Sequence, residues 1–214
     1  MDAGLLPVKR LDRAKQRLST HLSGDERRRV AEALLEDALS LCGTVEFLEW
    51  WVVSDDPYVL SEANGRGLAT FEDPGEGLNA AVSAAVVAVA AAGAESVTVI
   101  PSDAPLAFRG DLVDLLDTGA TSEIVLVPSQ RDGGTNGMYI TPPELLRPTF
   151  GEGSLRRHLE QAERESRRCA LLSLPRLALD IDTVEDIREF LSKPKHAPSR
   201  TAEVLEELRY RVAD

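Results

Sequence analysis

Short runs of β-branched and other apolar residues alternate along this chain with longer segments of helical periodicity. The runs that predict strands lie at 5–6, 50–53, 68–71, 96–100, 123–127, 137–140, 171–174 and 177–179. The segments that predict helices lie at 23–41, from about 78, at 111–116, shortly after 143, at 154–167, from 183, and at 202–212. This alternation is typical of an α/β fold, a mostly parallel sheet with helices on both faces.

Local signals define several of these boundaries. Ser23 and Glu26 occupy the positions of a capping box at the start of the first helix. Leu5-Leu6 predicts only the remnant of a first strand, two or three residues short. With 214 residues, we expect one domain over 1–192, followed by a linker (KPKHAPS) and a C-terminal helix as an appendage over 193–214.

The charge balance restricts the partners. Thirty-six acidic against twenty-four basic residues give a net charge of −12, which disfavours nonspecific binding to nucleic acid or anionic membranes. Cys42 and Cys169 are isolated, so neither a disulfide framework nor a zinc site is indicated. The N-terminus lacks the apolar core of a secretory signal, and the longest apolar stretch, 80–92, predicts a buried helix. We therefore expect a cytoplasmic protein.

A basic cluster follows the first strand directly. It comprises Lys9, Arg10, Arg13, Lys15 and Arg17, all within nine residues. Ligands of open α/β sheets bind outside the carboxyl ends of the strands, and a positive loop at that edge suits a polyphosphate. The alternative is a solvated basic turn.

Aspartates follow two other strand-like runs. Asp103 comes just after the run SVTVI, and Asp180 and Asp182 come just after 177–179. Residues at i and i+2 of an extended segment point to one side, so both carboxylates of the pair can face one site. Mg²⁺ typically takes one or two such carboxylates together with the phosphates of a substrate, so these acids predict a metal site. The alternative is helix capping, since Asp103 can cap a turn and Thr183 with Asp186 forms a capping box beside Asp182.

Two glycine-rich segments could bind an anion. The first is GGTN at 133–136, for which a tight hairpin is an equal alternative. The second is FGEGS at 150–154, where Ser154 opens a helix and could either bind an anion or cap it. His158, one turn further on, fits a structural role better than a catalytic one. The sequence contains no GxSxG, GxxxxGK[ST] or GxGxxG motif.

Together these segments resemble one enzyme family. The matching stretches are PVKRLDRAKQRLS at 7–19, GLNAAV at 77–82, VTVIPSDAPL at 97–106, VLVPS at 125–129, GGTNGM at 133–138, FGEGSLRRH at 150–158 and LALDIDTVEDI at 177–187. They resemble the guanylyltransferases that make the phosphodiester precursor of the deazaflavin coenzyme F-420, which act on 2-phospho-L-lactate or phosphoenolpyruvate. The C-terminal helix lies outside these stretches. The resemblance implies a nucleotide-diphospho-sugar-transferase-like fold.

The same resemblance implies roles for individual residues. Those that would hold Mg²⁺ are Asp103, Asp180 and Asp182. Those that would bind a phosphorylated three-carbon acid are Thr135, Gly151 and Ser154. Those that would bind GTP are Lys9, Lys15 and Arg17 along the triphosphate, with Asp73 and Asn79 beside the nucleoside. Those that would be catalytic are Asp103, Lys9 and Lys15.

Several alternatives stay open at this stage. The chain looks more like the bacterial members, which favours phosphoenolpyruvate as acceptor and enolpyruvyl-diphospho-5'-guanosine as product; 2-phospho-L-lactate and 3-phosphoglycerate are the alternatives. Asn136 and Gly137 stand where some bacterial relatives carry small apolar residues. A molybdopterin or sugar-phosphate nucleotidyltransferase would carry a glycine-rich loop with an Arg-Met pair, which 7–19 lacks. A non-catalytic nucleotide-binding regulator is the alternative of another class, and a homodimer could form through the C-terminal helix.

Overall fold

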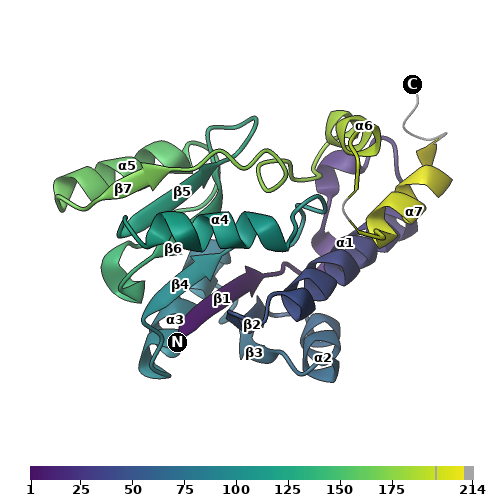
Figure 1. Cartoon of the computed structure of the whole chain (residues 1–214). Helices are drawn as coiled ribbons and strands as arrows, with labels where there is room; N and C mark the ends of the chain where they lie inside the picture. The colour runs from purple at the N-terminus through teal and green to yellow at the C-terminus, as the bar shows by residue number, and fades with distance from the viewer. Residues whose placement is uncertain (196, 210–214) are drawn as a thin grey trace.

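The computed structural model describes residues 1–195 and 197–209 and contains a seven-stranded sheet of order β3-β2-β1-β4-β6-β5-β7 (Figure 1). The strands are β1 (Asp2–Pro7), β2 (Glu49–Ser54), β3 (Ala69–Glu72), β4 (Ser96–Val99), β5 (Ile124–Pro128), β6 (Thr135–Ile140) and β7 (Cys169–Leu171). Only β6 runs antiparallel to its neighbours β4 and β5 among these described strands. The predicted mostly parallel sheet is therefore confirmed.

The strand directions determine where the loops meet. Because β1, β2, β3, β4 and β5 run the same way, the segments that follow them all leave from one edge of the sheet. The antiparallel strand β6 begins at that same edge, with Thr135. Residues far apart in the sequence are thus brought together at the carboxyl edge, where α/β proteins bind their ligands.

Helices cover both faces of the sheet (Figure 1). The α-helices are α1 (Gly24–Thr44), α2 (Pro57–Gly65), α3 (Leu78–Ala91), α4 (Arg109–Gly119), α5 (Ser154–Arg164), α6 (Val184–Ser192) and α7 (Arg200–Glu207). Short 3-10 turns are η1 (Leu11–Arg13), η2 (Gln16–Leu18) and η3 (Pro143–Leu145). One core cluster joins α1, α2 and α4 to the sheet, and the other joins α3 and α5 to its opposite face.

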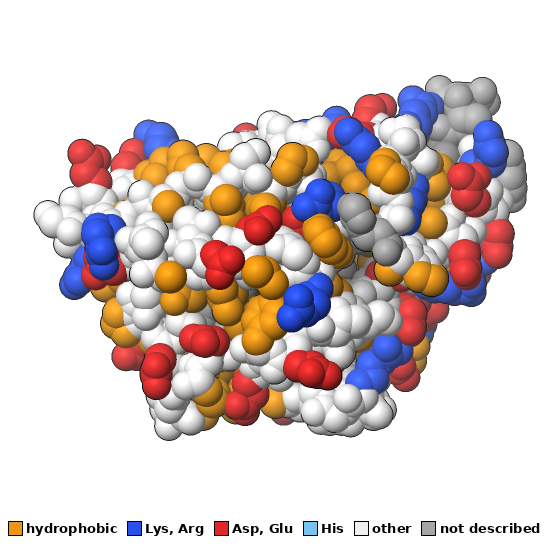
Figure 2. Space-filling view, in the orientation of Figure 1, with side chains coloured by type: hydrophobic (Ala, Val, Ile, Leu, Met, Phe, Trp, Pro, Cys, Tyr) orange, Lys and Arg blue, Asp and Glu red, His pale blue; other side chains and the backbone are white. Residues whose placement is uncertain are grey.

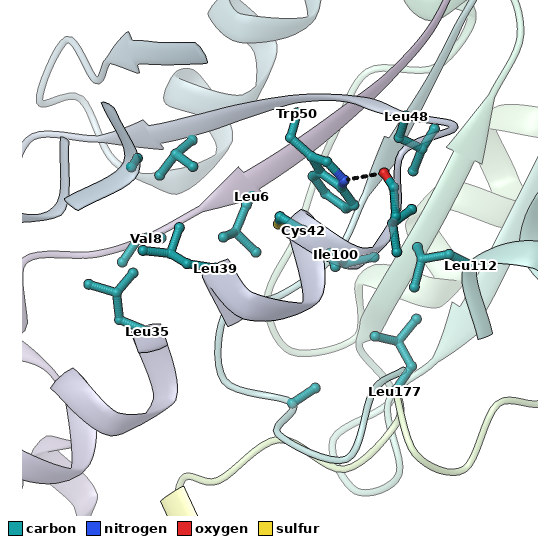
Figure 3. Close-up of a cluster of buried hydrophobic side chains, with 14 of the residues drawn as sticks. Leu6, Val8, Leu35, Leu39, Cys42, Leu48, Trp50, Ile100, Leu112 and Leu177 are labelled. Carbon is teal, nitrogen blue, oxygen red and sulfur yellow. Dashed lines mark hydrogen bonds between the residues drawn. The ribbon is translucent and has the colours of Figure 1, made fainter. Parts of the chain in front are cut away.

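Side-chain alternation along β1 explains the two cores. Leu5 packs on the α3 side and Leu6 on the α1 side, since successive strand residues point to opposite faces. Figure 3 shows Leu6 among the side chains of α1, with the Trp50 indole beside them. The Trp50 Nε1–H donates to the Val45 carbonyl at 3.2 Å. Gly4 is required next to this ring, because an added Cβ would lie 2.5 Å from it.

A third cluster fixes the C-terminal helix. Val204 and Leu205 of α7 are buried together with Phe190 of α6 and Leu34 of α1. Asp37 of α1 also accepts hydrogen bonds from the start of α7. The described part of the C-terminal helix is therefore packed against the domain and is not the expected appendage, while the predicted extension over 210–212 lies outside the described residues, as does one residue, 196, of the expected linker.

Most predicted elements are present, with four corrections. β1 has six residues and is not a remnant. The sequence interpretation missed α2, although Asp56 caps it and Pro57 is its first residue. The charged helix α5 ends at 164 rather than 167, and residues 177–179 form a turn rather than a strand. No described helix combines the length and the apolar character that crossing a membrane requires.

Candidate active site

Three carboxylates converge at the carboxyl edge of the sheet. Asp103 follows β4, and Asp180 and Asp182 lie on the segment that returns from β7. The Ile181 N–H donates to the Asp103 carbonyl at 3.0 Å, which joins the two segments. One oxygen of each carboxylate lies within 4.8 Å of the others, while Ile181 is buried. The sequence placed these acids together, although the pair follows a turn and not a strand.

Lys15 lies against two of these carboxylates. Its Nζ is 2.6 Å from Asp103 Oδ2 and 3.2 Å from Asp182 Oδ1, and its side chain is only 7% exposed. Burial lowers the pKa of Lys15, but the charges of Asp103 and Asp182 outweigh burial and the net pKa is raised. Arg17 reaches Asp182 from outside at 3.3 Å. Lys15 is thus a buried, charged ammonium in the middle of the acidic group.

Asp180 is a partly buried carboxylate whose pKa is raised. Burial raises its pKa, and the neighbouring charge of Asp103 raises it further. Asn136 opposes this by donating its Nδ2 to Asp180 Oδ1 at 3.1 Å. The same amide nitrogen reaches the carbonyls of Leu177 and Ala178, so it also fixes the turn before Asp180. The sequence singled out Asn136 as part of the GGTN segment but did not indicate its bond to Asp180.

The donor set fits a divalent cation. Three carboxylates offer the hard oxygen atoms that Mg²⁺ and similar ions prefer. Burial, and then the charge of Asp103, raise the pKa of Asp180, and a bound cation would offset both effects. The structure therefore contains an acidic triad able to bind a divalent metal.

A cleft leads from the triad along the loop after β1. Its volume is about 400 Å³, in the range of ligand pockets, and Lys9, Arg13, Lys15, Asp103 and Asp182 are among its lining residues. A second pocket of about 250 Å³ shares Lys9 and Arg13 with it. The predicted basic loop therefore lines an open cleft that ends at the acids, and is not only a solvated turn.

The two residues expected beside the nucleoside, Asp73 and Asn79, have different surroundings. Asp73 lines the smaller pocket. Asn79, in the first turn of α3, donates its Nδ2 to the Phe150 carbonyl at 3.2 Å. This bond holds the 150–154 turn next to α3 at the same edge of the sheet.

The three residues expected to bind the acid are close together, but their polar groups are largely occupied. The Thr135 N–H donates to Ser154 Oγ at 2.9 Å, and Thr135 Oγ1 lies 3.0 Å from Nδ1 of His158. Ser154 and His158 are fully buried, whereas Gly151 is exposed. The Thr149 N–H donates to the other ring nitrogen of His158 at 2.9 Å. His158 is therefore the structural histidine that the sequence indicated.

The start of α5 is not the open anion site that the sequence allowed. Gly153 is the N-cap residue, and Ser154, expected to cap the helix, is its first helical residue. The backbone N–H groups of Gly153, Ser154 and Leu155 donate to the carbonyls of Asp132, Gly151 and Gly133. These bonds consume the donors of the helix start and join it to the 132–134 loop.

Asp186 and Arg131 support the site and were not recognised as part of it. Asp186 completes the predicted capping box with Thr183, and its Oδ2 also accepts from the Asp182 N–H at 3.0 Å. Its Oδ1 pairs with Arg131 Nε at 2.7 Å, with the Asp186 side chain 3% exposed. This pair joins the 180–182 segment to the loop before β6. Only the capping signal was visible in the sequence.

A larger cavity of about 610 Å³ lies away from the triad. Leucines and prolines dominate its lining, which includes Leu171, Leu174 and Pro175 and none of the three aspartates. Figure 2 shows hydrophobic side chains gathered over β7 and the segment that follows it. The cavity's basic residues Arg176 and Lys193 are paired with Asp111 and Glu189, so we do not assign the reaction to it.

Comparison with known proteins agrees with this geometry. The family model described as guanylyl transferase CofC like matches residues 3–214, so the match includes the C-terminal helix that the sequence motifs had left out. A phosphoenolpyruvate guanylyltransferase of Sphaerobacter thermophilus is 33% identical over 195 residues, which is 91% of this chain and 93% of the relative. A 2-phospho-L-lactate guanylyltransferase of Methanothermobacter thermautotrophicus is 33% identical over 211 residues, 97% and 91% of the two chains.

The fold has solved relatives as well. A Desulfovibrio desulfuricans crystal structure assigned to the nucleotide-diphospho-sugar transferases superposes with a TM-score of 0.82 at 16% identity. The superposition covers 99% of this chain and 96% of that one. At this identity the likeness concerns the fold, which agrees with the predicted nucleotide-diphospho-sugar-transferase-like architecture.

Proposed function

Because this chain belongs to the guanylyl transferase CofC-like family, we propose that it transfers the guanylyl group of GTP to the phosphate of phosphoenolpyruvate. The products are enolpyruvyl-diphospho-5'-guanosine and pyrophosphate, in coenzyme F-420 biosynthesis. The observation that carries this proposal is the basic cleft that ends at Asp103 and Asp182, two members of the acidic triad that Asp180 completes. The chain is a nucleotidyltransferase, and the acceptor is the part that experiment must decide.

The chemistry requires alignment and charge stabilisation more than proton transfer. An oxygen of the acceptor phosphate attacks the α-phosphorus of GTP, the bond to the β-phosphate oxygen breaks, and pyrophosphate leaves. A phosphate monoester is ionised near neutral pH, so it needs no general base. The protein's residues hold two anions in line and stabilise the charge on the leaving group.

We assign the charges of the cleft to the parts of this reaction. Lys9 and Arg17, both exposed, would contact the triphosphate, and Lys15 would move from its carboxylate partners toward phosphate oxygens. Asp103, Asp180 and Asp182 would hold Mg²⁺, which supplies Lewis-acid stabilisation of phosphate oxygens when bound. Gly151, exposed beside Asn79 and Phe150, is where we expect the acceptor's phosphate to approach.

Phosphoenolpyruvate is the acceptor that the relatives favour, since the first of them carry that name. Relatives named for 2-phospho-L-lactate match at similar identity, which keeps that acid as the second candidate. The two acids share a carboxylate and a phosphate and differ at one carbon–carbon bond.

The test is a panel of three acceptors, phosphoenolpyruvate, 2-phospho-L-lactate and 3-phosphoglycerate, each with GTP, ATP, CTP and UTP. Pyrophosphate release and product mass are measured with Mg²⁺ present. We expect turnover with GTP and phosphoenolpyruvate to exceed the other combinations at least tenfold. Turnover mainly with 2-phospho-L-lactate would move the assignment to that acid. GTP binding without release of pyrophosphate from GTP, whichever acceptor is present, would instead support a non-catalytic regulator.

A further inference from the structure

The smaller pocket combines apolar side chains with charged ones beside the proposed reaction cleft. It lies where the loop after β1 meets the ends of β2 and β3 and the start of α3, with a volume of about 250 Å³. Its apolar lining is formed by Pro7, Val8, Val53, Leu78 and Ala81, and charged side chains complete the lining: Lys9, Arg10, Arg13, Asp55 and Asp73. Gly75 and Gly77 close one side, and no atom lies within 4 Å of a Cβ added to either.

This pocket is continuous with the proposed reaction cleft. Pro7, Val8, Lys9, Arg13 and Leu78 line both, and the larger cleft continues to Lys15, Asp103 and Asp182. A nucleotide whose base occupies the smaller pocket would therefore carry its phosphates past Lys9 and Arg13 toward the triad. The reverse orientation would place the phosphates beside Asp55 and Asp73, away from the acidic triad that would hold the metal.

Two carboxylates, Asp55 and Asp73, line this pocket, and they differ in the hydrogen bonds that they already accept. Oδ1 of Asp73 accepts a hydrogen bond from the Gly75 N–H at 2.8 Å. Asp55, directly after β2 and half-buried, makes no hydrogen bond or ion pair within 1–195 and 197–209. Its neighbour Asp56, by contrast, uses both oxygens, accepting from the N–H groups of Leu11 and Tyr58. Both carboxylate oxygens of Asp55 are thus available as acceptors at the pocket wall, with the charge of Arg10 nearby.

Base chemistry decides which ring suits such a wall. Guanine presents two adjacent donors, N1–H and the N2 amino group, and an ionised carboxylate accepts two parallel hydrogen bonds. Adenine and cytosine each present an acceptor nitrogen on this edge, which a carboxylate repels. We propose that Asp55 selects guanine by accepting from N1–H and the N2 amino group, with Asp73 beside it at the pocket wall. This inference rests on the proposed function and names the residue that determines its nucleotide.

The test exchanges the hydrogen-bonding pattern on both partners. Asp55→Asn turns one acceptor into a donor, which matches xanthine, where a C2 carbonyl replaces the amino group. With acceptor present, kcat/KM for pyrophosphate release is measured for GTP, inosine triphosphate and xanthosine triphosphate. For the wild-type chain we expect GTP to exceed both analogues at least about tenfold. D55N should lose at least about tenfold with GTP and gain as much with xanthosine triphosphate.

The controls separate base reading from folding and from net charge. E72Q removes one negative charge from an exposed carboxylate at the end of β3 and should leave the GTP preference unchanged. D55N should unfold at the wild-type temperature. An equal loss with all three nucleotides, or an unchanged GTP preference, would overturn the proposal, and a switch to xanthosine in D73N alone would transfer the role to Asp73.

Direct binding keeps this inference independent of the reaction. Calorimetric titration of the full chain with GTP and with xanthosine triphosphate reads base selection without an acceptor. If no acceptor is turned over but D55N still exchanges the two affinities, the proposed function fails and the guanine site stands. If turnover with GTP is normal and D55N leaves both affinities unchanged, the guanine site fails alone.

Discussion

The Asn136 side chain holds Asp180 in place, with 3.1 Å between Nδ2 of the amide and Oδ1 of the carboxylate. Asn136 lies on β6 and Asp180 on the segment after β7, so the bond joins two segments that are distant in sequence. Because the amide N–H donates to Oδ1, it restricts how the Asp180 carboxylate can turn next to Asp103 and Asp182. A partner that orients a metal ligand in this way typically changes metal affinity when it is removed.

The first prediction concerns cation affinity. Asn136→Ala should weaken binding of Mn²⁺, used as a probe for the divalent site, by roughly 10-fold or more because Asp180 loses its orienting bond. Binding to the full chain is followed by electron paramagnetic resonance, with thermal unfolding measured without cation to exclude a folding defect. Asn64→Ala removes an exposed amide on α2 and serves as control. Equal Mn²⁺ affinities for wild type and N136A would refute the positioning role.

The second prediction concerns turnover. Asp180→Asn and Asp182→Asn should each reduce kcat at least about 100-fold, which corresponds to roughly 2.7 kcal/mol of transition-state stabilisation. Each substitution removes a carboxylate charge from the triad without changing side-chain volume much. The measurement is pyrophosphate release at saturating Mg²⁺ and substrates.

A charge-matched control belongs with these variants. Asp117→Asn removes a carboxylate from the exposed side of α4 and should leave kcat within about twofold. Substitutions on the surface, away from the active site and the core, have small effects. Near-normal turnover of both D180N and D182N, at any Mg²⁺ concentration, would remove the triad from the mechanism.

The third prediction concerns pH and stability. Burial, with the charge of Arg157, lowers the pKa of His158 to about 4 from its ordinary 6.5. The neutral ring is therefore favoured by folding, and the unfolded chain takes up the proton first as pH falls. The contribution of the neutral His158 ring to the free energy of unfolding is therefore complete above pH 6.5 and is lost as the pH falls from 6.5 to 4. By linkage, the free energy of unfolding is about 2 kcal/mol lower at pH 5 because of this one group.

Subtraction isolates this contribution from other titrating groups. The free energy of unfolding in urea is measured for wild type and His158→Gln at pH 7.5 and at pH 5. H158Q should be less stable than wild type at pH 7.5, and the difference should shrink by about 2 kcal/mol at pH 5. His21→Gln, at an exposed histidine, serves as the control variant. A difference that is constant with pH would mean that His158 titrates normally.

The sequence was sufficient wherever a local pattern determines the structure. The run SVTVI became β4 because its residues favour an extended, buried strand, and Ser23 with Glu26 formed the expected capping box at α1. Asp103 could be placed at the ligand-binding edge because a parallel strand ends there. These predictions needed only neighbouring residues.

The remainder depended on tertiary contacts. Ser154 has the sequence of a capping residue, but its hydroxyl accepts from Thr135 of β6, a partner that no spacing rule indicates. Residues 177–179 have a strand-like composition, but Asn136 and Gln130 bind their backbone carbonyls and hold a turn. The roles of Asp55 and Asp186 likewise follow from which segments meet at the sheet edge.

The last prediction concerns a buried ion pair outside the active site. Asp111 is fully buried and receives two bonds from Arg176, at 3.2 and 2.7 Å, while the guanidinium lies 4.4 Å from the centre of the Phe108 ring. Arg176→Met should destabilise the chain by roughly 3 kcal/mol, the low end for a broken buried pair because Arg176 is one-third exposed. Asp111→Asn should lower the free energy of unfolding by less, since Arg176 can turn toward water.

Urea unfolding of the full chain measures both variants, with Arg156→Met on the surface of α5 as control. A larger cost for D111N than for R176M would show that the lost hydrogen bonds, and not the stranded carboxylate, dominate this pair.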